Sequence, residues 1–151
     1  MRLSAIRRGL TLASSLLIIG SMLIVIGTFY TIDHLSVQSV TSRRTVSPQG
    51  LTFTLTFNIH NAGLYDVSIN LLGRILSAQQ DIVQNSTRWT VTPGTVSNHT
   101  FTLQIDNATA ATYFTPLAPQ PIFDFTVVGT TAYGLLSVTL TGQRNINITG
   151  G

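Results

Sequence analysis

Residues able to bind a metal ion or move a proton are few in this chain, and they are widely spaced. The histidines are His34, His60 and His99, and none belongs to an H-x-H or H-x-x-x-H pattern or has a pair of carboxylates nearby. A metal ion needs several nitrogen, oxygen or sulfur ligands around it. We therefore expect three surface histidines, with no metal site and no cofactor.

Groups for acid–base or nucleophilic catalysis are equally sparse. The chain has no Cys, Lys or Glu, no Gly-x-Ser-x-Gly motif, and no Ser directly beside a base in the sequence. We expect Asp66 and Asp124 to face solvent and Asp106 to cap a helix. The pair Arg88-Trp89 could stack on a glycan, although a Trp in a strand usually belongs to a core. The sequence predicts a protein that is not an enzyme and has no small-molecule substrate.

A polar insert interrupts the alternation of apolar and polar residues in the middle of the chain. Apolar residues occupy every second position in 51–59, and the alternation resumes in 65–71, with His60-Asn61-Ala62-Gly63 between the two. Asn hydrogen-bonds its own main chain in turns, and Gly gives the φ > 0 freedom that a turn or bulge uses. We interpret Asn58, Asn61 and Gly63 as a turn that defines the fold and not as a reactive site.

The net charge of +3 comes from the N-terminal tail. All eight basic residues are Arg, and three of them are Arg2, Arg7 and Arg8; the other five balance five Asp. A nucleic-acid-binding protein needs a basic face that displaces counterions from phosphates. The sequence shows no such face, so we expect no nucleic-acid partner.

The tail is followed by an uncharged apolar stretch, LTLASSLLIIGSMLIVIGTFY, at residues 10–30. As a helix it would span about 30 Å, the thickness of the hydrocarbon core of a bilayer. Arg on its N-terminal side predicts a cytoplasmic N-terminus and an exported C-terminal domain. We predict a single-pass anchor over 10–31 in the cell membrane, with the lipid bilayer contacted by Leu10, Leu16, Leu17, Ile18, Ile19, Leu23, Ile24, Val25, Ile26 and Tyr30.

In two alternatives to an anchor, the N-terminal segment is cleaved by a protease. A cleaved secretory signal usually has an apolar core of about 7–15 residues and a small-x-small cleavage site, whereas this stretch is longer and lacks that site. Residues 7–17, RRGLTLASSLL, resemble the leader of archaeal type IV pilins and archaellins, which is cut after a glycine. In that case cleavage falls between Gly9 and Leu10, although Ser14 stands where pilins usually carry Glu.

In the rest of the chain, apolar residues recur with a period of two, as in β-strands. Besides the strand at 51–60, we expect strands at 65–72, 88–92, 100–105, 123–128, 135–141 and 146–148, with a weaker candidate at 37–40. One short helix is expected at 106–111, and Pro93-Gly94 is a turn dipeptide. This spacing predicts a mainly β protein, an Ig- or fibronectin-like antiparallel β-sandwich with one short helix. The predicted organisation is a basic tail at 1–9, a transmembrane helix at 10–31, a stalk or first-strand segment at 32–50, and a sandwich at 51–151 that could begin near 36.

Four N-x-S/T sequons lie in this exported part of the chain. They begin at Asn85, Asn98, Asn107 and Asn147, and three of them fall in predicted turns or loops. A glycan on a sequon requires an exposed Asn in an exported protein. These four residues are the candidate glycosylation sites.

The order of these features resembles the LEA14-type late embryogenesis abundant family, also called the water-stress and hypersensitive-response (WHy) domain. The resemblance covers roughly 35–142 and rests on LTFTLTFNIHN, LYDVSINLLGRIL, HTFTLQI and FDFTVVGTTAYGLLSVTLTG. The family has an Asn-Pro-Asn-like motif at the first of these, onto which Asn58 or Asn61 maps, but Ala62-Gly63 stands where the family has its Pro. The resemblance implies an Ig-like or fibronectin-like sandwich without catalytic residues.

These observations predict a non-enzymatic, membrane-anchored protein with a binding, scaffolding or protective role at the cell surface. Other surface or filament proteins are its expected partners. The alternative is a pilin-like or archaellum-associated subunit of a surface filament, cleaved after Gly9.

Overall fold

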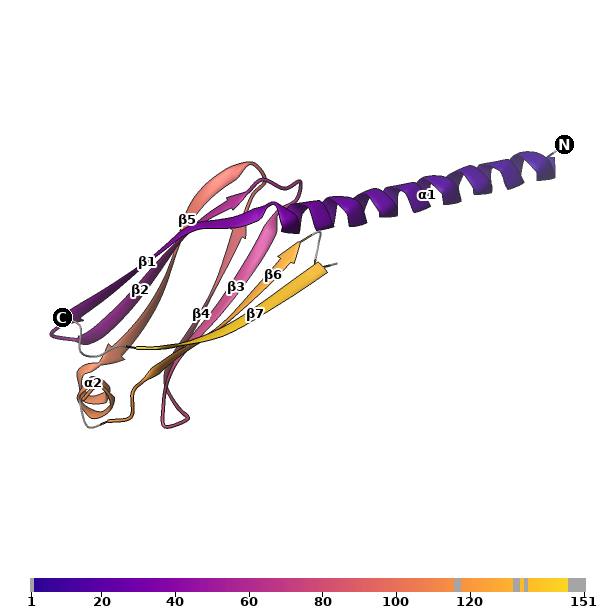
Figure 1. Ribbon diagram of the computed structural model, residues 1–151. Helices are drawn as coiled ribbons and strands as arrows, with labels where there is room; N and C mark the ends of the chain where they lie inside the picture. The colour runs from indigo at the N-terminus through magenta and orange to yellow at the C-terminus, as the bar shows by residue number, and fades with distance from the viewer. Residues whose placement is uncertain (1, 116–117, 132–133, 135, 147–151) are drawn as a thin grey trace.

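The computed structural model describes residues 2–115, 118–131, 134 and 136–146, and within 2–13 it describes the backbone alone. A long helix, α1 (Arg2–Asp33), leads directly into β1 (Leu35–Ser47) and then β2 (Gly50–Asn61). The remaining elements are β3 (Val67–Ser77), β4 (Gln80–Val91), β5 (Thr95–Asp106), α2 (Asn107–Tyr113), β6 (Ile122–Thr131) and β7 (Leu136–Asn145). Figure 1 shows α1 projecting away from the strands, with α2 at their opposite end.

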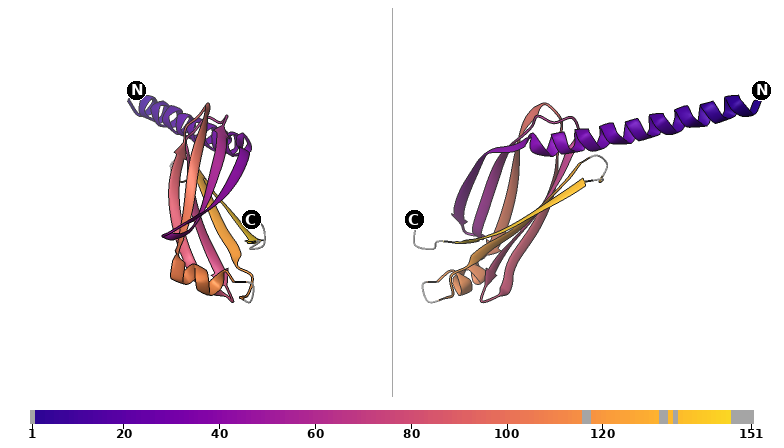
Figure 2. Two further views of the ribbon diagram at one scale, coloured as in Figure 1. Left: turned by 90° about the vertical axis from the view of Figure 1, so that its left-hand side faces the viewer. Right: turned by 45° about the vertical axis from the view of Figure 1, so that its right-hand side comes forward.

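The strands form two antiparallel sheets packed as an Ig-like β-sandwich. One sheet has the order β1-β2-β5 and the other β4-β3-β6-β7. In the left view of Figure 2 the strands run up the page, and both views show α1 leaving near one end of the sandwich. The mainly β sandwich with one short helix and an N-terminal apolar helix, as the sequence predicted, is confirmed.

The core lies between the sheets and follows the period of two in the central strands. Every second residue of β3, and of β5 from Phe101 onward, is buried, because a pleated strand points alternate side chains to opposite faces. One cluster is Leu51, Leu71, Ile75, Phe101, Leu103 and Ile105, and a second, nearer α1, is Ile59, Val67, Ile69 and Val91. Gly73 permits close packing, because a Cβ there would lie 2.6 Å from the ring of Phe101.

Two of the four edge strands, β1 and β7, are exposed on both faces. β1 pairs with β2 from Leu35↔Asn61 to Ser47↔Gly50, with a bulge between Val37 and Ser39. By this pairing Val37 and Val40 belong to the inner face, yet they are 57% and 53% exposed. The sandwich is therefore open along the side where β1 and β7 face one another.

The structure changes several details of the predicted elements. Residues 35–47 form a full strand, of which the sequence pattern had indicated only 37–40, and β4 begins at Gln80 instead of Arg88. The predicted strand at 146–148 is wrong at Ile146, which follows β7 outside any strand, and 147–148 lie outside the described residues. The expected helix is α2, and Asp106 caps it: its Oδ1 accepts from the Thr109 N–H at 2.8 Å.

Asp124 is a correction to the sequence analysis. It occupies the outward-facing phase of β6, but only 7% of it is exposed. Arg74, its neighbour across the β3–β6 ladder, covers the carboxylate and donates to Oδ2 from Nη2 and Nε. Alternation predicts the face of a strand on which a residue lies, but not whether a long cation on the next strand covers it. Asp66 is exposed, as expected.

Candidate functional site

The last turns of α1 pack against the polar insert and the two residues that follow it, and buried Thr31 is the centre of this junction. From here on, the insert means residues 60–65. Its hydroxyl oxygen accepts from the N–H groups of Leu64 and Tyr65, at 3.0 Å and 3.2 Å. The same hydroxyl donates to the Gly27 carbonyl one turn earlier in the helix, at 2.8 Å. Thr31 therefore satisfies two main-chain donors of the insert that would otherwise be buried without a partner.

Asn61 holds the insert from the sandwich side and is fully buried. Its Nδ2 donates to the carbonyls of Tyr65 and Val91, both at 2.9 Å, and its Oδ1 accepts from the Gly63 N–H at 3.0 Å. Its own carbonyl accepts from the Gly94 N–H in the β4–β5 turn. Every polar group of this side chain is used to fix main chain, so Asn61 is a structural residue.

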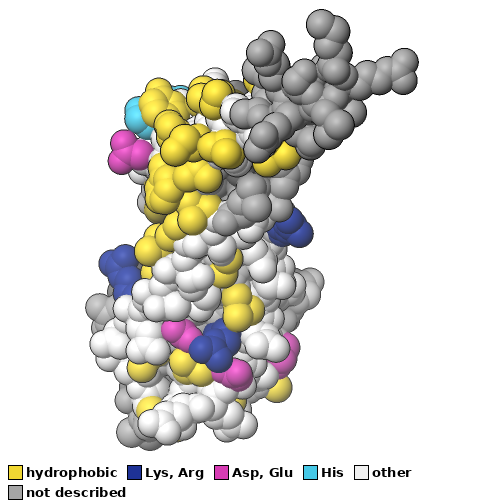
Figure 3. Space-filling model, turned by 90° about the vertical axis from the view of Figure 1, so that its right-hand side faces the viewer, with side chains coloured by type: hydrophobic (Ala, Val, Ile, Leu, Met, Phe, Trp, Pro, Cys, Tyr) yellow, Lys and Arg dark blue, Asp and Glu magenta, His cyan; other side chains and the backbone are white. Residues whose placement is uncertain are grey.

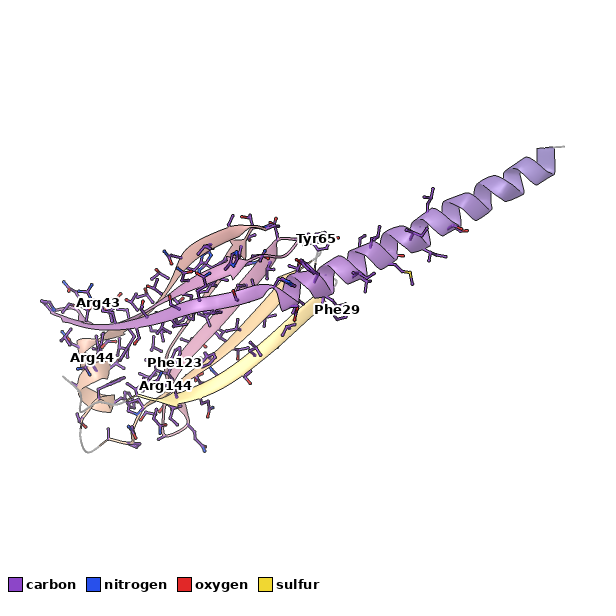
Figure 4. The ribbon with its side chains drawn as sticks, turned by 45° about the horizontal axis from the view of Figure 1, so that its top comes forward. Phe29, Arg43, Arg44, Tyr65, Phe123 and Arg144 are labelled. Atoms are coloured by element: carbon purple, nitrogen blue, oxygen red, sulfur yellow. The ribbon has the colours of Figure 1, made fainter. Side chains whose placement is uncertain are left out.

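Gly63 is required for a reason that the sequence analysis missed. The expectation that it supplies a positive φ is wrong, since the described glycines with positive φ are Gly50, Gly94 and Gly134. Instead, a Cβ on Gly63 would lie 2.5 Å from Thr31 Cα, and a Cβ on Gly27 would lie 2.8 Å from the Tyr65 ring. Gly63 lets the insert approach the backbone of α1, and Gly27 makes room for the Tyr65 ring, which Figure 4 labels beside α1.

Asn58, the other residue of the predicted turn, lies elsewhere. It is within β2, on the outer face, between Ser39 of β1 and Asn98 of β5. Its Oδ1 is buried and has no hydrogen-bond partner among the described residues. The structure separates it from the Asn61–Gly63 turn.

An apolar cavity of about 310 Å³ opens beside this junction, between β1 and β7. We call the opening between these two edge strands the open seam. Its helix-side end is lined by Ile32 and Leu35, its rims by Val37, Val138 and Leu140, and its floor by Phe57, Ile69, Trp89, Val127 and Gly129. Figure 3 shows hydrophobic side chains gathered near the base of α1 and continuing down the sandwich.

The far end of the open seam has a different character. A second cavity of about 310 Å³ lies there, lined by apolar core residues and by Arg43, Arg44 and Arg144. Figure 4 places these three arginines and Phe123 at the end of the sandwich remote from α1. The ring of Phe125 packs against Gly142 between the two cavities. The seam is thus apolar beside the helix and basic at its far end.

A Ser–His pair closes the opposite side of the sandwich. Ser97 and His99, two residues apart on β5, share the inner face, and Ser97 Oγ lies 2.8 Å from His99 Nε2. His99 stacks on Trp89 with ring centroids 5.0 Å apart, and Trp89 contacts Phe57. No ion pair between His99 and a carboxylate is present in the described part of the chain. The sequence analysis considered only a base directly beside a Ser. Residues i and i+2 of a strand share one face, so this spacing could have revealed the Ser97–His99 pair.

The remaining candidate residues are scattered over the molecule. His60 lies on the outer face of β2, and His34 stacks on Tyr30 at the end of α1 with ring centroids 3.9 Å apart. Arg88 donates to Ser68 Oγ on the outer face of its sheet, so it does not form a stacking pair with inward-facing Trp89. Among the described residues no three His, Asp or Glu side chains form a group that could hold a metal ion.

Three of the four sequon asparagines are exposed in the structure. Asn85 and Asn98 lie in strands β4 and β5, which corrects the expectation of turns, and Asn107 begins α2. The side-chain amides of Asn85 and Asn107 donate to the carbonyls of Thr102 and Pro48. Asn147 lies outside the described residues.

The predicted anchor residues lie in α1. Side chains of its apolar part are exposed on all sides; they include Leu16, Leu17, Ile18, Ile19, Leu23, Ile24, Val25, Ile26 and Tyr30. The stretch Ser14–Asp33 has a mean hydropathy of 2.1 and is long enough to cross a membrane. Arg2, Arg7, Arg8, Gly9 and Leu10 belong to the same helix, but their side chains lie outside the described part.

Comparison with known proteins shows the fold alone. No protein-family model and no curated protein matches the chain. A solved protein from Archaeoglobus fulgidus is 13% identical with a TM-score of 0.54, and the match covers 74% of this chain and 94% of that one. A protein from Arabidopsis thaliana is 8% identical over 74% of this chain and 79% of that one, with a TM-score of 0.43. A putative beta-galactosidase from Bacteroides fragilis is 18% identical over 68% of this chain and 15% of that one, with a TM-score of 0.42.

The junction predicts a specific loss of stability in Gly63→Val. A larger side chain at this position must push into the backbone of α1 at Thr31, and such overpacking costs about 1–3 kcal/mol. Thermal unfolding of the full chain in detergent should show a lower midpoint for Gly63→Val and little change for Ala62→Val, whose position is exposed. Equal midpoints for Gly63→Val and the wild type would contradict the close packing of helix and insert.

The half-buried stack of His99 on Trp89 predicts a pH-dependent stability. Burial lowers the pKa of His99 below its usual 6.5, so the unfolded chain binds a proton more readily than the folded one. Stability should therefore rise as the pH increases through the window below about 6.5, and fall on acidification. His99→Phe keeps an aromatic ring against Trp89 but cannot titrate. Unfolding midpoints measured across this window should show a weaker pH dependence for His99→Phe; an identical dependence in both proteins would refute the assignment.

Proposed function

We propose that this chain is a non-enzymatic protein that α1 anchors in a membrane and whose β-sandwich binds or scaffolds other components at the cell surface. The observation that carries the proposal is α1 itself. Its side chains from residue 14 onward are apolar on every side and mostly exposed, whereas a helix on the surface of a soluble domain buries one apolar stripe and shows a polar face.

The junction supports a direct display of the sandwich at the membrane surface. Only His34 separates α1 from β1, and the Thr31 and Asn61 hydrogen bonds fix the end of the helix to the insert. A flexible linker would let the domain tumble, whereas this arrangement sets the distance and the orientation of the sandwich relative to the helix. A domain held in a fixed orientation on the helix suits a binding or scaffolding role better than a domain on a flexible linker.

The described side chains also favour a binding role over catalysis. The Ser97–His99 pair points into the sandwich and has no acidic partner among the described residues, and the cavities of the open seam contain no carboxylate. The exposed Asn85, Asn98 and Asn107 would carry glycans on the exported side. The relationship to the LEA14-type family is compatible with this role and stays a prediction.

A filament subunit is the second candidate, and the continuity of α1 favours it. The helix runs unbroken from Arg2 to Asp33, through the Gly9–Leu10 bond at which a pilin-like leader would be cut. After such a cut, an exposed apolar helix would remain at the N-terminus and could pack against the same helix of neighbouring subunits. Cleavage and assembly are the features that separate this candidate from a permanent anchor.

The anchor predicts detergent-dependent extraction of the native chain. Arg at the centre of a membrane helix costs about 2.5–3.5 kcal/mol per residue, so Leu17→Arg/Leu23→Arg should move the chain from the membrane fraction to the soluble fraction or abolish its accumulation. Leu72→Arg, on the outer face of β3, is the matched control and should stay in the membrane fraction. Recovery of the wild-type chain in the soluble fraction without detergent would refute the proposal.

N-terminal sequencing and intact mass of the native chain distinguish the two candidates. An anchor predicts Met1 or Arg2 as the first residue, whereas a filament subunit predicts Leu10. The same mass measurement, repeated after deglycosylation, should fall if any of the exposed sequon asparagines carries a glycan. An unchanged mass would exclude glycosylation of the sample.

A further inference from the structure

The open seam exposes apolar side chains that a closed sandwich would bury. Val37 and Val40 of β1, and Val138 and Leu140 of β7, occupy inner-face positions by strand register, yet each is at least 39% exposed. Contiguous exposed apolar surface beside a cavity marks a site of interaction. The cavity of about 310 Å³ is within the range of small-ligand sites.

The position of this cavity relates it to the membrane anchor. Ile32 belongs to the last turn of α1, Leu35 is the first residue of β1, and both line the cavity. The seam therefore begins where the apolar helix ends. An alkyl chain could pass from the bilayer into the cavity along apolar side chains without crossing water.

The seam changes from apolar to basic with distance from α1, and a lipid in a bilayer leaflet changes from apolar tail to charged headgroup in the same order. The end beside α1 is lined by apolar side chains, and the remote end contains Arg43 and Arg144 (Figure 4). The ion pairs of the described residues involve Asp33, Asp81 and Asp124, and none of them includes Arg43 or Arg144. An anionic lipid of the exported leaflet has its tail toward the membrane and its headgroup away from it, so it matches this order.

We propose that the open seam binds one alkyl chain of an anionic lipid drawn from the surrounding bilayer, with the headgroup at the arginine-lined far end, where Arg144 lies on the inner face. The proposal rests on the membrane anchorage of α1. The lipid chain lies over Phe57, Trp89 and Val127 and covers Val138 and Leu140, which are otherwise in water. Guanidinium groups at the far end form charge-assisted hydrogen bonds to the phosphate.

The dimensions agree with a single lipid chain. From Ile59 to Phe53, the length of β2 along the seam is about 20 Å at roughly 3.3 Å per residue. One leaflet contributes about 15 Å of hydrocarbon, half of the total thickness. The two cavities are separate, with the Phe125 ring and Gly142 between them, so a chain that reaches from the base of α1 to the arginine end passes over the Phe125 ring.

Trp89 allows this proposal to be tested directly, because it is the only Trp in the chain and it lines the apolar cavity. Full-length protein is placed in phosphatidylcholine nanodiscs that contain phosphatidylglycerol with brominated acyl chains. Bromine quenches indole fluorescence at short range, so a chain in the seam should quench Trp89. Bromine placed on the phosphatidylcholine instead should quench less, because that headgroup carries no net negative charge.

Gly129→Phe is the variant that fills the cavity. A Cβ at Gly129 meets nothing within 4 Å, and its position on the inner face of β6 directs the ring into the seam. Quenching should fall to the level of bromine-free discs. Val128→Phe, the next residue on the same strand but on the outer face, is the matched control and should be quenched like the wild type.

Arg144→Glu tests the headgroup end at an exposed position. Loss of a charge-assisted hydrogen bond should raise the amount of brominated phosphatidylglycerol needed for half-quenching about tenfold. This variant keeps the proposal testable if Gly129→Phe fails to fold.

The remaining outcomes also decide the question. Equal quenching of Gly129→Phe and Val128→Phe, or no dependence on the headgroup, would overturn the proposal. Quenching by an added brominated fatty acid, but not by the brominated lipid, would assign the seam to a soluble amphiphile and overturn the membrane source. Dimers in the discs with an unquenched Trp89 would assign it to a second copy of the chain. Failure of the chain to enter nanodiscs would instead refute the membrane anchorage, so the two failures are distinguishable.

Discussion

The contact on which the rest of the structure depends is the hydrogen-bonded packing of Thr31 against the insert around Asn61. Thr31 accepts from two main-chain N–H groups of the insert, and Asn61 binds the insert to the end of β4. Both side chains are fully buried. Loss of either partner would leave buried main-chain groups without hydrogen bonds, and each such group costs about 1–3 kcal/mol. The helix and the sandwich therefore behave as one body at this point.

This contact also decides which part of the sandwich lies beside α1. Because α1 ends on the insert, the apolar cluster of Ile59, Val67, Ile69 and Val91 lies at the helix end of the domain. The open seam begins at the same end, at Ile32 and Leu35. The remote end, with α2 and the arginines, is then the most distant from α1 (Figures 1 and 4). Under the proposed membrane anchorage, the helix would set the direction of the sandwich as well as its location.

Sequence periodicity could predict most of the fold, because it depends on local alternation. The strands around β2, β3, β5, β6 and β7, the cap at Asp106 and the apolar helix all follow from patterns within a few residues. Much of β4 and β1 was missed because these strands are rich in polar residues and lie at sheet edges, where burial imposes little alternation. The roles of Asp124 and Gly63 could not be predicted, because each depends on a partner distant in sequence: Arg74 is 50 residues from Asp124, and Thr31 belongs to another element.

The sandwich closes on one side and stays open on the other for a reason that the strand register shows. On the β4–β5 side, Trp89 stacks on His99 and Ser97 binds the imidazole, so aromatic and weakly polar groups fill the space between the sheets. On the β1–β7 side, the inner-face positions toward the far end include Arg44 and Arg144. Closing the sheets over guanidinium groups would remove charge from water at a cost that apolar contacts at Val37 or Leu140 could not offset. The arginines therefore hold the seam open while the apolar residues beside the helix line it.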